Sequence, residues 1–102
     1  MPSNQLPLSE DELNSLLQAR PEWSLRGGKL VRQWIFNDFV AAIAFVNRAA
    51  ALAEQANHHP DIDIRYNRVE LALVSHDAGG ITARDARMAR QLSAEFPATV
   101  VF

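Results

Sequence analysis

The chain contains three histidines, and each stands where a regular element is predicted to end. His58 and His59 follow the longest predicted helix, and His76 follows the last predicted strand, just before a loop that contains glycines. Functional side chains are commonly carried at such ends, because a rigid scaffold holds them in place. An imidazole can bind a metal or transfer a proton near neutral pH. The three histidines together therefore predict a functional site.

Two carboxylates are candidates to join this site, and each also has a structural explanation. Glu54 lies one helical turn before His58, at the i, i+4 spacing of a supporting hydrogen bond, although it can equally be a solvated helix carboxylate. Asp85 stands three residues after Thr82, where a carboxylate stabilises a helix N-terminus without any catalytic role. A histidine at a helix C-terminus can likewise bind only the last free carbonyls. Spacing alone leaves both explanations open.

Other kinds of site fit the sequence less well. The adjacent side chains of His58 and His59 diverge at a helix end, and no His-x₃-His spacing places two zinc ligands on one helix face. No serine has the context of a nucleophile elbow. The chain has no cysteine, which excludes thiolate metal sites, thiol catalysis and disulfides. We therefore expect no metal site.

The size and charge of the chain restrict its class. Its 102 residues, 48% of them hydrophobic and 22% charged, predict one globular domain over 1–102, with a loose N-terminal tail over 1–7. Ten basic and twelve acidic residues give a net charge of −2, so there is no electrostatic basis for binding nucleic acid. No apolar run approaches the roughly 18–20 residues of a membrane span, and the N-terminus lacks the features of a signal peptide. We expect a cytoplasmic protein with no membrane partner.

A short helix and a hairpin are predicted first along the chain. Ser9 and Glu12 have the spacing of a capping box, and a leucine stripe with i, i+3, i+4 spacing follows them. Gly27 and Gly28 supply a turn between two runs of alternating apolar residues, which predicts two antiparallel strands. Arg32 falls on the apolar face of the second strand, where it either reaches the sheet edge or shows that the register is misassigned.

The longest helix is predicted over about 39–57, with Asp38 as its N-cap. Its apolar residues form two stripes, of which one is Phe39, Ile43, Val46, Ala50 and Ala53, and the other is Ala42, Phe45, Ala49, Leu52 and Ala56. Covering a sheet needs only one stripe. The second, in which alanines permit close approach, suggests packing against another subunit, so a homodimer or tetramer is predicted.

A second hairpin follows, because the apolar residues change parity between 62 and 73. A straight strand would place Ile62, Ile64 and Tyr66 on one face and Val69, Leu71 and Leu73 on the other. A two-residue turn at Asn67-Arg68 pairs 66 with 69, 64 with 71 and 62 with 73, which places all six on one face.

The last helix begins at Thr82, with Asp85 at the N3 position, and its apolar stripe continues to Phe96. The order of elements is therefore helix, two strands, helix, two strands, helix. This order predicts an α+β fold of two layers, in which helices cover one face of a four-stranded antiparallel sheet.

The sequence around the histidines resembles the pterin-4a-carbinolamine dehydratases. The matching segments read EQANHHPD at 54–61, YNRV at 66–69 and SHDAGGIT at 75–82, and Asp85 and Ala89 follow. The resemblance extends to about Leu92. A His-His-Pro sequence alone is weak evidence, but here a third histidine comes 17 residues after His59, and an aspartate comes nine residues later. This combination is specific.

The resemblance implies a fold, an assembly and a reaction. Members of the family have an antiparallel four-stranded sheet with helices on one side, and they form dimers and tetramers through the long helix. The implied reaction converts 4a-hydroxytetrahydropterin to quinonoid dihydropterin and water, without a metal or a bound cofactor. A ring nitrogen expels the 4a-hydroxyl group, an acid protonates that oxygen and a base collects a ring N–H proton. Histidine suits both tasks because its unperturbed pKa is about 6.5.

The resemblance also implies roles for five residues. His58 and His76 would be the acid–base pair, although the sequence does not say which is the acid. His59 would hold the pterin, Asp85 would bind or orient near the site, and Glu54 would support His58. Three positions depart from the pattern common among relatives, which affects the shape of the pocket rather than the chemistry: Ile62, Ser75 and Ala78.

Two other functions remain open. Some relatives act as dimerisation partners of a transcription factor or as assembly factors, so the same fold can serve as a binding module without catalysis. Loss of a site histidine would favour that alternative, and all three are present. A metal-dependent hydrolase is the third hypothesis, and stoichiometric zinc in the purified protein would support it.

Overall fold

The computed structural model describes residues 6–101. It contains the predicted helices and strands in the predicted order, together with a 3₁₀ turn, η2, and a short final strand, β5. The elements are α1 (Glu10–Ala19), β1 (Ser24–Arg26), β2 (Lys29–Phe36), α2 (Phe39–Ala56), β3 (Asp61–Arg65), β4 (Arg68–Leu73), η2 (His76–Ala78), α3 (Ala83–Glu95) and β5 (Val100–Val101).

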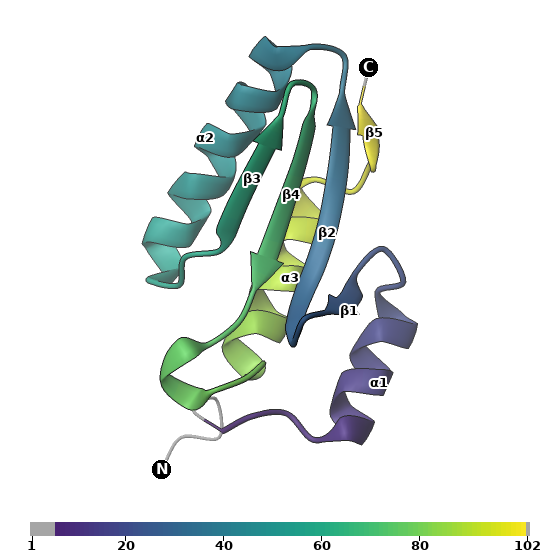
Figure 1. The fold of residues 1–102 in the computed structure, drawn as a ribbon, viewed down its shortest axis with the longest axis vertical. Helices are drawn as coiled ribbons and strands as arrows, with labels where there is room; N and C mark the ends of the chain where they lie inside the picture. Colours follow the sequence, from purple (N-terminus) through teal and green to yellow (C-terminus); the bar gives the residue numbers. More distant parts are fainter. Residues whose placement is uncertain (1–5, 102) are drawn as a thin grey trace.

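The sheet has the strand order β1-β2-β4-β3, and each neighbouring pair along this order is antiparallel. In addition, β5 pairs with β2 in the parallel direction at Ile35 and Phe36. Figure 1 shows α3 behind the sheet, α2 along the side of β3, and α1 next to β1. The predicted α+β class, with helices packed on an antiparallel sheet, is confirmed, and β5 is an addition to it.

The core lies on one face of the two central strands. Leu30 stands opposite Leu73 and Trp34 opposite Val69 in the β2–β4 register, and all four side chains are fully buried. Phe45 of α2 packs on Trp34 with 4.8 Å between ring centroids. This face therefore joins the sheet to the helices, and alternation along each strand leaves the other face more polar.

Arg32 is buried within this core face, so neither explanation offered for it from the sequence is correct. It stands opposite Leu71 in the β2–β4 register and is only 2% exposed. Its guanidinium lies 4.4 Å from the ring centroid of Trp34 and donates to Ser93 Oγ and to the carbonyl of Pro97. Burial lowers the pKa of this guanidinium, and the nearby carboxylate of Glu22 opposes that effect. The hydrogen bonds and the aromatic ring compensate for removing the charge from water.

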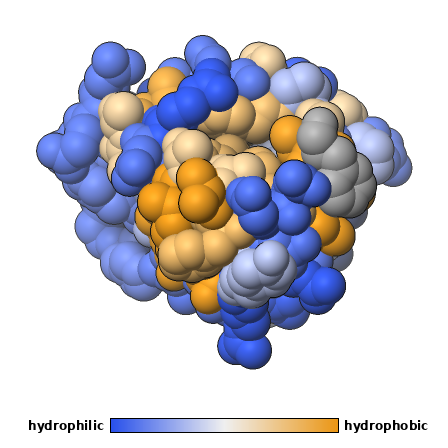
Figure 2. All heavy atoms as spheres, turned by 90° about the horizontal axis from the view of Figure 1, so that it is seen from above, coloured by the Kyte–Doolittle hydropathy of each residue, from blue (hydrophilic) through white to orange (hydrophobic). Residues whose placement is uncertain are grey.

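The alanine-rich stripe of α2 does not have the role predicted for it. Ala42, Phe45 and Ala49, from the alanine-rich stripe, are buried in the core, whereas Phe39 at the start of the other stripe is 48% exposed. The prediction that the alanine-rich stripe faces another subunit is therefore wrong. The alanines let the helix approach its own sheet closely, and Phe45 of the same stripe packs on Trp34. Figure 2, which looks onto the end of the molecule where α2 begins, shows hydrophobic side chains at the surface.

The helix α2 is also long and apolar enough to cross a membrane, since its 18 residues have a mean hydropathy of 1.2. The prediction that no segment approaches this length is therefore wrong for α2. Its sequence includes Arg48 and Glu54, which are exposed, and four of its side chains are buried against the core. This pattern is typical of a helix that covers a sheet.

The second hairpin turns one residue earlier than predicted. Arg65 pairs with Arg68, Ile64 with Val69 and Ile62 with Leu71, so the turn is Tyr66-Asn67. The backbone of Phe36 fixes it, because Asn67 Nδ2 donates to the Phe36 carbonyl at 3.0 Å and the Phe36 N–H donates to the Asn67 carbonyl at 2.8 Å. Tyr66 consequently has a positive φ of 54° and is exposed. The shift preserves parity, so the predicted shared face is confirmed for the strand residues.

The N-terminal tail predicted over 1–7 lies mostly outside the described residues. Pro7 is described and forms an isolated bridge with Thr82, and the Leu8 N–H donates to the carbonyl of Ile81 at 2.7 Å. The end of the predicted tail is therefore attached beside the start of α3. The capping box predicted at the start of α1 is confirmed, and so are the predicted N-cap Thr82 and N3 residue Asp85 of α3, which also form a capping box.

Candidate active site

The first turn of α3 contains a fully buried carboxylate, Asp85, whose two oxygens have different partners. Oδ2 accepts from the Thr82 N–H at 2.9 Å and from the Ser75 hydroxyl at 2.8 Å. Oδ1 lies 2.5 Å from Nε2 of His58. One oxygen of Asp85 therefore caps the helix, as the structural explanation requires, while the other contacts a histidine.

The end of α2 directs His58 toward this carboxylate. After Ala56 the chain reverses at Asn57, which takes a left-handed conformation with φ 49°. The His58 N–H then donates to the Ala53 carbonyl at 3.1 Å, a hydrogen bond typical of a helix that ends in this way. The side chain of His58 is only 12% exposed. The reversal thus places an imidazole inside the protein at the point where α2 meets α3.

The hydroxyl groups beside Asp85 form a short chain of hydrogen bonds. Ser75 Oγ lies 2.9 Å from Thr82 Oγ1 as well as 2.8 Å from Asp85. Since each hydroxyl has one proton, Thr82 donates to Ser75 when Ser75 donates to the carboxylate. A carboxylate can only accept, so Nε2 of His58 is the donor in the remaining hydrogen bond and its Nδ1 is left as an acceptor. The network therefore fixes which nitrogen can take a proton.

Glu54 does not support His58, contrary to the prediction. Its carboxylate lies 2.5 Å from Nε2 of His59, and both side chains are largely exposed. The i, i+4 rule applies within a continuous helix, whereas α2 ends at Ala56 and Asn57 turns the chain. His58 is thereby turned inward, and His59 lies over the last turn of the helix.

His76 begins the turn that follows β4, and its side chain is exposed. Its ring makes no hydrogen bond to the other described residues, but its neighbour Ser75 binds Asp85 directly. Figure 1 shows the end of α2 and the turn after β4 at the same end of the molecule. The structure therefore links His58 to Asp85 by direct contact and links the base of the His76 turn to them through Ser75.

Sequence reasoning missed the role of Ser75, and it also missed an ion pair beside it. Arg84 Nη2 donates to Asp77 Oδ1 at 2.7 Å, which joins the first turn of α3 to the turn that carries His76. The order Ser75-His76-Asp77 was a signal for both, because it places two polar side chains next to a candidate histidine. No group of three or more His, Asp or Glu residues that could hold a metal ion occurs within residues 6–101.

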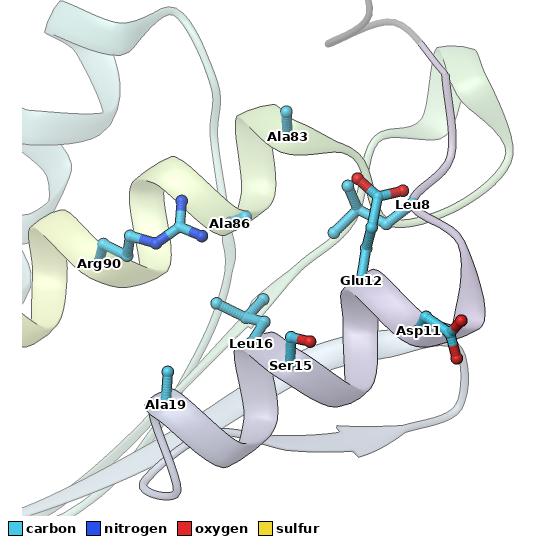
Figure 3. Close-up of a pocket in the computed structure, with 9 residues that line it drawn as sticks. All are labelled: Leu8, Asp11, Glu12, Ser15, Leu16, Ala19, Ala83, Ala86 and Arg90. Carbon is cyan, nitrogen blue, oxygen red and sulfur yellow. The ribbon is translucent and has the colours of Figure 1, made fainter.

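A surface hollow elsewhere on the protein does not coincide with this polar cluster. It has a volume of about 540 Å³ and lies between α1 and α3, with Leu8, Leu16 and Ala86 as apolar lining and Arg90 at one side (Figure 3). None of its lining residues is a histidine. We therefore base the candidate site on the hydrogen-bonded residues around Asp85, because proton chemistry requires titratable groups held in place.

Comparisons with known proteins agree with the resemblance found in the sequence. Residues 6–95 match the profile of the family described as pterin 4 alpha carbinolamine dehydratase. Provisionally named pterin-4-alpha-carbinolamine dehydratases of Thermomicrobium roseum and Chloroflexus aurantiacus are 56% and 57% identical. The first match covers 84% of this chain and 92% of the relative, and the second covers 80% and 88%.

Solved structures give the same result for the fold. A transcriptional coactivator/pterin dehydratase from Brucella melitensis is 38% identical and has a TM-score of 0.79, over 86% of this chain and 96% of that one. A pterin dehydratase-like protein described as a RuBisCO assembly factor of the alpha-carboxysome is 22% identical, with a TM-score of 0.62 over 76% of this chain and 92% of that one. At this lower identity the likeness concerns the fold alone. The match over residues 6–95 and the identity to these relatives show that the chain belongs to the pterin-4-alpha-carbinolamine dehydratase family.

Proposed function

We propose that the protein dehydrates a 4a-hydroxytetrahydropterin to quinonoid dihydropterin and water. The observation that carries this proposal is the buried Asp85, which binds His58 through one oxygen and the residue before His76 through the other. In the reaction the bond between carbon 4a and its hydroxyl oxygen breaks, and the lone pair of a ring nitrogen supplies the electrons. The oxygen leaves as water after protonation, and a ring N–H proton goes to a base. The balance is the loss of one water molecule.

The surroundings of the two histidines suggest how they divide this work. Nδ1 of His58 is the accepting nitrogen, and the Asp85 carboxylate behind the ring stabilises the imidazolium formed when Nδ1 takes a proton. We therefore assign His58 as the base. His76 is exposed on a turn, where its ring can be protonated from solvent and can give that proton to the leaving hydroxyl. Positioned acid–base groups contribute about 10²–10⁴-fold to a rate.

His59 and Glu54 are assigned to substrate binding. Their side chains form a hydrogen-bonded pair at the surface next to His58. The pterin ring carries several N–H and carbonyl groups, and a histidine held by a carboxylate can bind such a group in a fixed direction. Glu54 therefore orients His59 in this proposal. No metal and no bound cofactor is required for any step.

The assembly and the location belong to the same proposal. Phe39 and Val40 at the start of α2 are 48% and 76% exposed, and we assign this surface to contact with another copy of the chain, in a homodimer or tetramer. Sedimentation at several concentrations measures the assembly, and a purely monomeric protein would contradict it. We place the protein in the cytoplasm, with a small pterin as substrate and with neither nucleic acid nor membrane as partner.

A non-enzymatic binding protein is the alternative, and the same exposed surface of α2 is the observation that favours it. A surface of this kind can bind a different protein as well as a second copy. The complete set of hydrogen bonds around Asp85 favours the enzyme, because a binding protein does not need a histidine held on a buried carboxylate. The two functions can also coexist on separate surfaces.

The test is the rate of dehydration of 4a-hydroxytetrahydropterin, which a hydroxylase generates in the assay. We expect the wild type to accelerate the reaction and His58→Ala and His76→Ala each to lower kcat by roughly tenfold or more. Gln91→Ala, an exposed change on α3, is the matched control and should retain the wild-type rate. A folded wild type that gives no acceleration over buffer would overturn the proposed function.

A further inference from the structure

The turn that carries His76 is attached to the rest of the protein at few points. Its backbone closes on itself, since Ser75 and Gly80 exchange hydrogen bonds of 3.0 and 3.3 Å. Gly79 completes the turn in a left-handed conformation with φ 70°. Within residues 6–101, the ion pair of Asp77 with Arg84 is the only side-chain hydrogen bond from residues 76–80 to another element. Beyond the backbone hydrogen bonds of the turn, this ion pair is thus the side-chain contact that can restrain the residues around His76.

Arg84 and Asp85 are neighbours in the first turn of α3, and they hold the two catalytic segments separately. Asp85 binds the ring of His58 directly, while Arg84 binds the residue after His76. The first turn of α3 is itself fixed by its capping box and by the Arg84 N–H, which donates to Thr82 Oγ1 at 3.2 Å. One rigid turn therefore sets the positions of both histidine segments relative to each other.

We propose that the Asp77–Arg84 ion pair is a positioning device that holds the His76 turn in the orientation required for proton transfer. This inference rests on the proposed function, in which His76 is the acid. Neither Asp77 nor Arg84 needs to touch the substrate. Each acts by limiting the motion of the turn, because a catalytic group that samples many orientations spends little time within reach of the reacting oxygen.

A structural role alone does not explain the pair. The side chain of Asp77 is 65% exposed and that of Arg84 is 25% exposed, and ion pairs in contact with water contribute little to the stability of a fold. The hydrogen bond from Arg84 lowers the pKa of Asp77, and the same bond raises the pKa of Arg84, so both groups are charged at neutral pH. The contact is therefore present under the conditions in which the enzyme acts, and its loss should affect the turn more than the core.

The first test is the kinetics of Asp77→Asn and Arg84→Gln. We expect each to lower kcat about tenfold, less than the roughly 100-fold that a 1 Å misplacement can cost, and to change KM less than kcat. Arg87→Gln is the matched control, because Arg87 is an exposed arginine on the same helix with no ion pair among the described residues. Asp77→Glu preserves the charge and should recover part of the lost rate. Unchanged kcat in both Asp77→Asn and Arg84→Gln would overturn the proposal.

A double-mutant cycle separates positioning from a general effect on the fold. If Asp77 acts through His76, then Asp77→Asn should have no further effect on kcat once His76 is replaced by alanine. An equal loss in the wild-type and His76→Ala backgrounds would show that the pair does not act through His76, and would overturn the proposal.

A measurement without substrate keeps the proposal separate from the proposed function. Backbone ¹⁵N relaxation reports the order of residues 76–79, and we expect order parameters to fall from about 0.85 toward 0.6 in Asp77→Asn but not in Arg87→Gln. If the wild type is inactive and the order falls, the proposed reaction is wrong and the positioning of the turn stands. If the order is unchanged, the pair does not hold the turn, whatever the activity.

Discussion

His58 and His59 are neighbours in the chain, and Nε2 of each lies 2.5 Å from a carboxylate oxygen, of Asp85 and of Glu54 respectively. The two histidine–carboxylate pairs nevertheless differ in their surroundings. The side chains of His58 and Asp85 are 12% and 0% exposed, whereas those of His59 and Glu54 are 57% and 77% exposed. The buried carboxylate also accepts from Ser75 and from the backbone, while the carboxylate of Glu54 accepts no further hydrogen bond from the described residues. The same two functional groups therefore form one buried pair and one exposed pair.

This difference follows from how water affects charged groups. At the surface, water solvates both partners and screens their attraction, so the net contribution of the pair is small. In the interior, a carboxylate without its donors keeps the full cost of desolvation, so each donor becomes essential. A fixed ring suits proton transfer, and a mobile ring suits contact with a ligand that must enter and leave.

The largest effect is expected from Asp85→Ala. The substitution leaves His58, the Ser75 hydroxyl and the Thr82 N–H without their acceptor, and breaking a buried pair in this way costs about 3–5 kcal/mol. The free energy of unfolding in urea measures this loss. Glu54→Ala is the matched control at the exposed pair and should change that free energy little. Similar losses for the two variants would show that burial does not distinguish the pairs.

A smaller effect is expected from Ser75→Ala. It removes one of the donors to Asp85 Oδ2 and leaves the His58 contact in place. Leaving a buried polar atom short of a partner costs about 1–3 kcal/mol, again measured by urea unfolding. Ser75→Thr keeps the hydroxyl and should retain most of the stability. If Ser75→Ala is as stable as the wild type, the Ser75 hydroxyl does not help to hold the carboxylate.

The sequence predicted the parts of the site that depend on local rules. The capping box of Thr82 and Asp85 involves residues three apart, and it placed Asp85 at the start of α3 correctly. The pairing of His58 with Asp85 joins residues 27 apart. That contact requires α2 to end at Ala56 and the chain to reverse at Asn57, which no local spacing specifies. Glu54 was assigned to the wrong histidine for the same reason.

For the fold, too, the sequence predicted the features that depend on local patterns. Alternation along β2 and β4 indicated which faces are buried, because that pattern is a property of each strand. The exact turn of the second hairpin was not predictable, since contacts of Asn67 with Phe36, 31 residues away, select it. Arg32 was also misinterpreted, because its partners Ser93 and Pro97 come from the far end of the chain. Contacts between distant segments therefore decided each of these details.

The exposed pair should affect binding more than stability. Glu54→Gln removes the charge beside His59 but retains a side chain of the same size, so we expect the free energy of unfolding to change by less than about 1 kcal/mol. If Glu54 orients His59 toward the substrate, KM should rise while kcat changes little. Steady-state kinetics of the dehydration, with Gln55→Glu as a neighbouring control, measures both. A fall in kcat with an unchanged KM would instead place Glu54 with the acid–base groups.

The smallest effect concerns pH and the Asp77–Arg84 pair, which resembles the exposed pair in its contact with water. The hydrogen bond from Arg84 holds the pKa of Asp77 below its usual value of 3.8. Because the pKa is lower in the folded protein than in the unfolded chain, the stabilisation from the pair is complete above the unfolded value and is lost as the pH falls through the folded value. The wild type should therefore be slightly more stable than Asp77→Asn at neutral pH, and the difference should vanish as the pH is lowered through the pKa of Asp77 in the folded protein. Urea unfolding of the two proteins across this range measures the difference and cancels the titration of the other carboxylates. A difference that stays constant at acid pH would mean that the charge of Asp77 does not maintain the contact with Arg84.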